Sequence, residues 1–275
     1  MSNSLPEFGE PPLIEVALSV QFEKLEAVRI PQLGLVWQAF HSRFPRTEEQ
    51  PPLEPSFEQF GPRAGGQPEV RLELLSRPPA PRLWFLNEEG TELVQVQRDR
   101  FVRNWRKKDE SDKYPGYHRL REAFRQDFYA LCQLVSERGW GSIELNQCEV
   151  TYVNLVTVGA EWSVHGELEK VITLFSSRYS DSDLGVPEEA AVDVKYVLND
   201  DVDRPVGRLH VHAMPVLRAS DNVPAIRLAL TARGLPEGGG VDGALRFFDR
   251  GREAIVRCFT SITTEAMHKN WKRMS

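Results

Sequence analysis

The chain has 275 residues, a length that fits one large domain or two domains of ordinary size. Its composition, 41% hydrophobic and 27% charged residues, excludes the low-hydrophobicity, high-charge class of disordered chains, so we expect it to fold. The 34 lysines and arginines are outnumbered by 40 aspartates and glutamates, and a net charge of -6 is the wrong sign for a protein that coats nucleic acid non-specifically. A local basic groove is compatible with this total.

The cysteines and the N-terminus indicate a compartment. Cys132, Cys148 and Cys258 are far apart and have no C-x-x-C spacing, which predicts neither a disulfide framework nor a structural zinc site. Residues 1–13 lack a basic start followed by an apolar core, and no apolar run approaches the roughly 18 residues that span a bilayer. We therefore expect a cytoplasmic protein with reduced thiols.

The chain opens with a strand and a helix. Residues 13–22 alternate between apolar side chains and small or polar ones, which is the period of a half-buried strand. Pro31 suits a first helical turn, and Pro45 stops the pattern that follows. The apolar residues between the two prolines repeat at three- and four-residue spacing: Leu33, Trp37, Phe40 and Phe44.

A group of extended runs and a long helix complete the first half. Residues 45–68 hold six prolines and three glycines, so at most one short strand fits there, near residues 53–59. An antiparallel meander is predicted from the extended runs at residues 69–76, 82–87, 92–97 and 100–106. From Tyr117 the apolar period changes to 3.6, and Gly139 is placed to end the helix.

The second half repeats this order of elements. A long extended segment at residues 143–158 is followed by a predicted helix at 163–179 and an acidic loop at 180–189. A second meander is predicted from the runs at residues 191–198, 207–217 and 225–232. After Gly238–Gly240 a final amphipathic helix is expected to continue for roughly 30 residues.

These patterns predict an α+β fold of two pseudo-repeated halves. Each half, residues 1–140 and 141–275, is expected to form a curved antiparallel sheet packed on a long amphipathic helix, because a sheet with one apolar face needs a layer to cover it. The repeat is one of pattern and not of sequence. One continuous domain is the alternative to two.

Basic and aromatic residues concentrate between Arg98 and Tyr117, where four arginines fall within nine residues. The candidate binding residues are Arg98, Arg100, Arg103, Trp105, Arg106 and Tyr114. Guanidinium groups clamp phosphate or carboxylate, and aromatic rings stack on planar groups, so this run suits an anionic, planar ligand such as a nucleotide. The alternative is a solvated hairpin in which Phe101 and Trp105 belong to the core.

Other candidate sites are weaker. His210 and His212 share one face of a strand at the spacing of some β-sheet metal sites, but a third ligand would have to come from another strand, with Asp193 or Glu149 as candidates. A polar sheet face is the alternative, and we predict no cofactor. Asn154, in a strand of β-branched residues, either makes a buried structural hydrogen bond or contacts a ligand or the arginine-rich strand.

Three segments carry a resemblance to a known family. They are PPLIEVALSVQF, LVQVQRDRFVRNWRKKDESDKYPGYHRLREAF and VTYVNLV. Together, in this order, they resemble a sporadically distributed family of uncharacterised bacterial proteins, and the resemblance runs nearly the whole length of the chain. It implies no reaction, ligand or catalytic residue. The patchy distribution of the family implies a defence-related or toxin-antitoxin setting.

We find no nucleophile elbow and no phosphate-binding loop. We therefore predict a non-enzymatic, cytosolic binding protein that recognises a protein partner through the hairpin at residues 98–106 and the exposed edges of its sheets. The alternative is a component that binds a nucleotide or nucleic acid, with or without hydrolytic activity. We expect no membrane partner, and exposed sheet edges would allow a homodimer.

Overall fold

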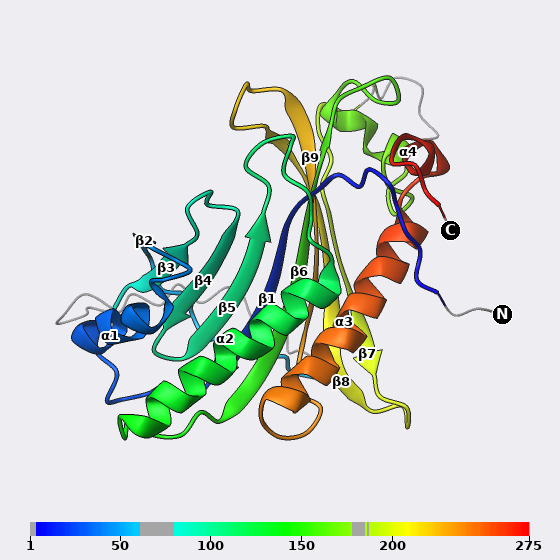
Figure 1. Cartoon of the computed structure of the whole chain (residues 1–275). Coiled ribbons are helices and arrows are strands. Elements are labelled where there is room, and N and C mark those ends of the chain that lie inside the picture. The colour runs from blue at the N-terminus through cyan, green and yellow to red at the C-terminus, as the bar shows by residue number, and fades with distance from the viewer. Residues whose placement is uncertain (1–3, 61–79, 178–184, 186, 275) are drawn as a thin grey trace.

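The computed structural model describes residues 4–60, 80–177, 185 and 187–274. Its centre is a nine-stranded antiparallel sheet with the order β2-β3-β4-β5-β1-β6-β9-β8-β7 (Figure 1). The strands are β1 (Leu13–Phe22), β2 (Arg46–Gln50), β3 (Arg82–Leu86), β4 (Glu92–Gln97), β5 (Arg100–Arg106), β6 (Leu145–Thr157), β7 (Val192–Asn199), β8 (Pro205–Leu217) and β9 (Pro224–Gly234). The helices are α1 (Ile30–Phe40), α2 (Tyr117–Glu137), α3 (Gly240–Ile262) and α4 (Glu265–Asn270), with a 3-10 turn, η1, at His165–Lys170.

Strands from both halves of the sequence belong to this one sheet. β1 pairs with β5 on one side and with β6 on the other, so the middle of the sheet joins residues that are more than a hundred positions apart in sequence. Alternate residues of β1, Val16, Leu18 and Val20, are fully buried on the side of the helices. The predicted α+β class and the predicted strand at residues 13–22 are confirmed.

The two long helices lie side by side on one face of the sheet (Figure 1). Apolar residues at helical spacing form the buried stripe of each helix, as on α2: Leu120, Phe124, Phe128, Leu131 and Val135. The rings of Phe124 and Phe248 meet edge to face at 4.8 Å and join α2 to α3. Gly251 lets α3 approach the sheet, because a Cβ there would lie 3.0 Å from that of Ala232.

The opposite face of the sheet is polar, and residues 51–60, which we call the strap, cross it. The Gln97 side chain donates to the carbonyl of Leu53 and accepts from its amide, at 2.9 and 3.0 Å. Gln21 accepts from the amide of Ser56 at 2.9 Å. These side-chain amides take the place of a strand ladder, so the strap is extended without joining the sheet.

The far end of the strap is held by a buried acid. Arg208 and His210 of β8 each bond to the Glu58 carboxylate at 2.6 Å. Burial alone would raise the pKa of Glu58, but these hydrogen bonds and the nearby positive charges hold that pKa below its ordinary value. Burial lowers the pKa of His210 and favours its neutral form. The strap therefore ties the first half of the chain to β8.

Three predicted elements differ in the structure. The helix predicted at residues 163–179 does not form in its described part, residues 163–177. Only η1 forms there, because the amide of Thr173 donates to the carbonyl of Ile262 at 2.7 Å and the chain follows the end of α3. The strand expected near residues 53–59 is the strap, and β2 lies before it. The extended run predicted at residues 69–76 lies outside the described residues.

The final helix is also shorter than predicted. It ends at Ile262, because Thr263 and Thr264 take up extended backbone, and the Thr264 hydroxyl caps α4 by accepting from the amide of Met267 at 3.4 Å. The hydroxyl of Thr263 donates to the carbonyl of Phe259 at 2.6 Å. Thr263 and Thr264 thus hydrogen-bond to backbone groups at the helix ends. A stretch with one continuous apolar period therefore forms two helices instead of one.

A buried ion pair between α2 and β5 predicts a large stability change. Asp127 is fully buried, 2.6 Å from Arg43 and 3.0 Å from Arg103, whose own side chain is only 3% exposed. Replacing Asp127 by Ala leaves the Arg103 charge buried beside a single remaining acid, Glu92. We expect the free energy of unfolding, measured by urea denaturation, to fall by about 3–5 kcal/mol.

The matched control is Glu122→Ala, which removes an exposed acid from the same helix. Its partner Arg125 is also exposed, so we expect almost no change in the urea midpoint. An equal midpoint for Asp127→Ala and the wild type would contradict the assigned role of the buried pair.

Candidate functional site

Alternate side chains of the arginine-rich strand β5 point to opposite sides of the sheet, as expected for a strand. Phe101, Arg103 and Trp105 point to the helix layer, and all three are buried. Arg103 forms ion pairs with Glu92 and Asp127 there. Arg103 and Trp105 are thus parts of the interior and are not exposed to a partner.

The remaining arginines of the run bond to groups of the same chain. Arg100 is 7% exposed and donates to the Gln21 side chain at 2.8 Å. Arg106 donates to the carbonyl of Gly90 at 2.8 Å, and Arg98 pairs with Glu26 at 2.9 Å. The run therefore offers little free guanidinium surface to a nucleotide.

The two histidines of β8 stack in parallel, with ring centroids 6.5 Å apart. His210 is bonded to Glu58, while His212 lies 3.7 Å from Asp193, one of the two acids considered as metal ligands. The other, Glu149, is paired with Arg233 at 2.6 Å. Within the described ranges no group of three His, Cys, Asp or Glu side chains could hold a metal ion.

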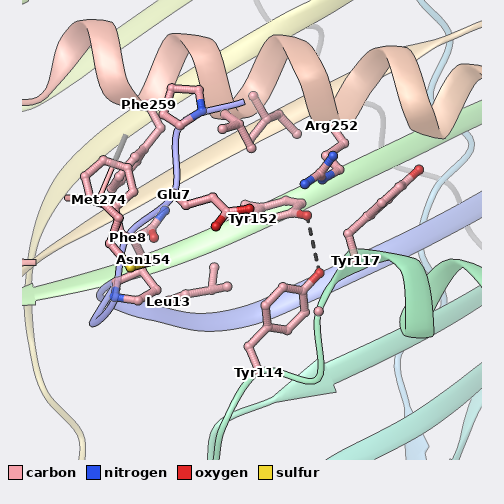
Figure 2. Close-up of a pocket in the computed structure, with 15 residues that line it drawn as sticks. Glu7, Phe8, Leu13, Tyr114, Tyr117, Tyr152, Asn154, Arg252, Phe259 and Met274 are labelled. Carbon is pink, nitrogen blue, oxygen red and sulfur yellow. Dashed lines mark hydrogen bonds between the residues drawn. The ribbon is translucent and has the colours of Figure 1, made fainter. Parts of the chain in front are cut away.

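A pocket of about 280 Å³ lies on the helix side of the sheet, between the N-terminal segment, β6 and α3 (Figure 2). We call it the tyrosine pocket, after Tyr114, Tyr117 and Tyr152 in its wall. Its outer wall is residues 6–11, which are held to the C-terminal tail. The amide of Gly9 donates to the carbonyl of Lys272 at 3.0 Å, and that of Met274 to the carbonyl of Glu7 at 2.9 Å.

The polar side chains Tyr114, Tyr117, Tyr152 and Asn154 of the tyrosine pocket each have a hydrogen-bond partner within the chain. The hydroxyls of Tyr114 and Tyr152 are 3.3 Å apart, and Tyr117 donates to Asp249 at 2.7 Å. Asn154, 4% exposed, donates to the carbonyl of Leu228 at 3.3 Å, which is the buried structural bond considered for it. Burial raises the pKa of all three phenols, so at neutral pH they remain protonated hydrogen-bond donors.

Arg252 supplies a cation to this pocket from α3. Its guanidinium carbon lies 4.8 Å from the centre of the Tyr117 ring, and Figure 2 shows the group pointing from the helix toward Tyr152. Two other arginines of α3 have acid partners: Arg250 pairs with Glu237 at 2.5 Å and Arg257 with Glu253 at 2.8 Å. Among the described residues, no carboxylate lies within ion-pair distance of Arg252.

A second pocket of about 330 Å³ adjoins the first and is more polar. We call it the Asp249 pocket. Tyr117 and Arg252 line both pockets, and the second also contains Leu5, His118, Arg121, Asp249 and Glu253. Arg121 binds both oxygens of Asp249, at 2.8 and 2.9 Å. Tyr117 and Arg252 therefore stand between a mainly apolar pocket and a charged one.

The thiols lie away from both pockets, and their pKa values make them weak nucleophiles. Burial raises the pKa of Cys132 and of Cys258 to about 11, and that of Cys148 rises further. Because the thiolate is the reactive form, these cysteines are largely unreactive at neutral pH.

Of the six candidate binding residues between Arg98 and Tyr117, only Tyr114 lines the pocket, and the ring of Trp105 lies 5.3 Å from that of Tyr114. Asn154, considered for a ligand contact, lines it as well, and Tyr152 belongs to the same sequence segment. Arg252 was missed: it follows a stripe residue of an amphipathic helix, a place where arginine is ordinarily solvent-exposed. Its role depends on where α3 meets the Tyr114 loop, which no local pattern shows.

Comparison with protein-family models, with curated proteins and with solved structures finds no match. In the described part of the chain, the helices are too short or too polar to cross a membrane.

The three buried phenols are expected to ionise only at a pH above that at which exposed tyrosines ionise. The unfolded chain ionises tyrosine near pH 10, whereas Tyr114, Tyr117 and Tyr152 stay neutral in the fold, so the folded state loses stability as the pH rises above about 10. We expect absorbance at 295 nm to show three fewer phenols titrating near pH 10 in the native protein than in urea. Tyr114→Phe should leave the native amplitude near pH 10 unchanged; a drop there would contradict the assignment.

Proposed function

We propose that this chain is a non-enzymatic binding protein that recognises a protein partner through the tyrosine pocket and the Asp249 pocket together. The observation that carries the proposal is that the two pockets share Tyr117 and Arg252. An apolar anchor beside a polar, charged rim is the arrangement typical of protein recognition sites. An extended segment of the partner would place one apolar residue in the tyrosine pocket and polar groups over Arg121 and Asp249.

The segments that carry the family resemblance support this choice of site. Leu13 belongs to the first segment, Tyr114 and Tyr117 to the second, and Tyr152 and Asn154 to the third. All five line the tyrosine pocket, although they are far apart in sequence. We propose that membership of that family and the use of this pocket go together, in a cytosolic, defence-related setting.

We further infer that the two halves are structural pseudo-repeats, with the site between them. In the sheet, β5, β4 and β3 follow β1 outward on one side, and β9, β8 and β7 follow β6 on the other. Each half then continues into its long helix, α2 or α3. Tyr114 and Tyr117 come from the first half, and Tyr152 and Arg252 from the second. Ligand sites are common where two such units meet.

A substitution that fills the tyrosine pocket tests the proposal. Val256, on α3, is half-buried and lines the pocket, so Val256→Trp should occupy the space of the partner's anchor. We expect a partner that co-purifies in stoichiometric amount with the tagged wild-type protein from its native cells to be reduced at least tenfold with the variant. The measurement is quantitative mass spectrometry of the purified complexes.

The matched control is Gln133→Trp, which puts the same side chain on an exposed position of α2 outside both pockets. It should retain the partner. Equal recovery with Val256→Trp and Gln133→Trp, both folded by circular dichroism, would refute the proposed site.

A further inference from the structure

The geometry points to the C-terminal residue of the partner as the group that the tyrosine pocket binds: an apolar side chain inside the pocket and the terminal carboxylate on Arg252. This inference rests on the proposed function and names its ligand class. It is carried by a cation, a hydrogen-bond donor and an apolar wall that meet in one small pocket.

The charge argument starts from Arg252. Arg252 is half-buried, and the contacts described for its guanidinium are the face of Tyr117 and the hydroxyl of Tyr152, neither of which carries a negative charge. A cation with no carboxylate in ion-pair contact can accept a ligand carboxylate at this point. Arginine presents paired N–H groups that match the two oxygens of a carboxylate.

A second donor comes from the tyrosine pair. When two hydroxyls share one hydrogen bond, as Tyr114 and Tyr152 do at 3.3 Å, one of the two O–H hydrogens is left for another acceptor. Because burial keeps both phenols protonated, that hydrogen is present at neutral pH. Arg252 and this hydroxyl lie on the same side of the pocket (Figure 2). Together they form a site for an anion.

The remaining residues of the pocket wall favour an apolar side chain on the terminal residue of the ligand. It consists of apolar side chains from the N-terminal segment, β1, α3 and the C-terminal tail: Phe8, Leu13, Ile255, Val256, Phe259 and Met274. The volume of about 280 Å³ is just below the range of ~300–1,000 Å³ that holds drug-sized ligands. The space thus fits one large apolar residue, and the chain leading to it would leave through the Asp249 pocket.

Glu7, on the N-terminal segment, adds a negative charge to the wall of the pocket. Figure 2 shows its carboxylate directed toward Tyr152, so it disfavours a ligand anion at the proposed site. This opposition gives two substitutions at one pocket with effects of opposite sign: Arg252→Gln weakens binding of an anion and Glu7→Gln strengthens it.

Calorimetric titration with peptide pairs tests the inference. The probes are acetyl-Gly-Ser-Gly-Ser-X peptides, with X as Leu, Ile, Met, Phe, Val or Ser, each prepared as the free acid and as the C-terminal amide. We expect at least one apolar acid to bind, its amide to bind at least tenfold more weakly, and the Ser acid not to bind. Arg252→Gln should remove the preference for the free acid over the amide, and Arg252→Lys should retain part of it. Glu7→Gln should increase the affinity for the free acid.

The outcomes separate this inference from the proposed function. Equal binding of acid and amide, lost in Val256→Trp, refutes the terminal carboxylate and leaves the partner site standing. Binding that Val256→Trp does not change refutes both. No binding of any acid at millimolar concentration refutes the inference. A third probe, 3-phenylpropionate, distinguishes the source of the carboxylate: if it binds as tightly as the best peptide acid, the ligand is a small molecule and both proposals fail.

Discussion

The antiparallel pairing of β1 with β6 is the interaction on which the rest of the molecule depends. The two strands come from opposite halves of the sequence, and Val16 and Val150 on their helix side are fully buried. In this register the amide of Leu155 donates to the carbonyl of Pro12 at 2.8 Å. The pairing therefore brings the N-terminal segment next to Tyr152 and Asn154, and so creates the pocket that α3 closes.

Most of the fold could be predicted from the sequence wherever a local period and the tertiary environment agree. The alternation of β1 and the helical stripe of α2 are read correctly because one face of each is buried in the same interior. Residues 163–179 have helical spacing too, but the backbone of residues 171–173 bonds to the end of α3 instead. The strap was unpredictable for a related reason: its partners are side-chain amides of distant strands.

The candidate site was only partly predictable. Tyr114 was found because it stands in a basic, aromatic run, yet Arg103 and Trp105 of the same run serve the interior. Alternation shows on which face of a strand a residue lies; it does not show what covers that face. Here Asp127, on a helix that follows in the chain, covers Arg103. Arg252 is the opposite case. Its position on α3 predicts exposure to solvent, but together with the loop that contains Tyr114 it lines a pocket.

These arginines differ in the groups of the chain that compensate their charge. A guanidinium removed from water requires compensating charge or hydrogen bonds, and Arg103 receives two carboxylates while Arg100 receives an amide oxygen and a carbonyl. Both guanidiniums are therefore bound by groups of their own chain, although the buried Nε of Arg100 has no hydrogen-bond partner among the described residues. Their density in the sequence reflects the polar and ionic layers of the sheet. Arg252 receives an aromatic face and a neutral hydroxyl. It lines the tyrosine pocket without an ion-pair partner among the described carboxylates, so in the proposed site its charge would be available to a ligand carboxylate.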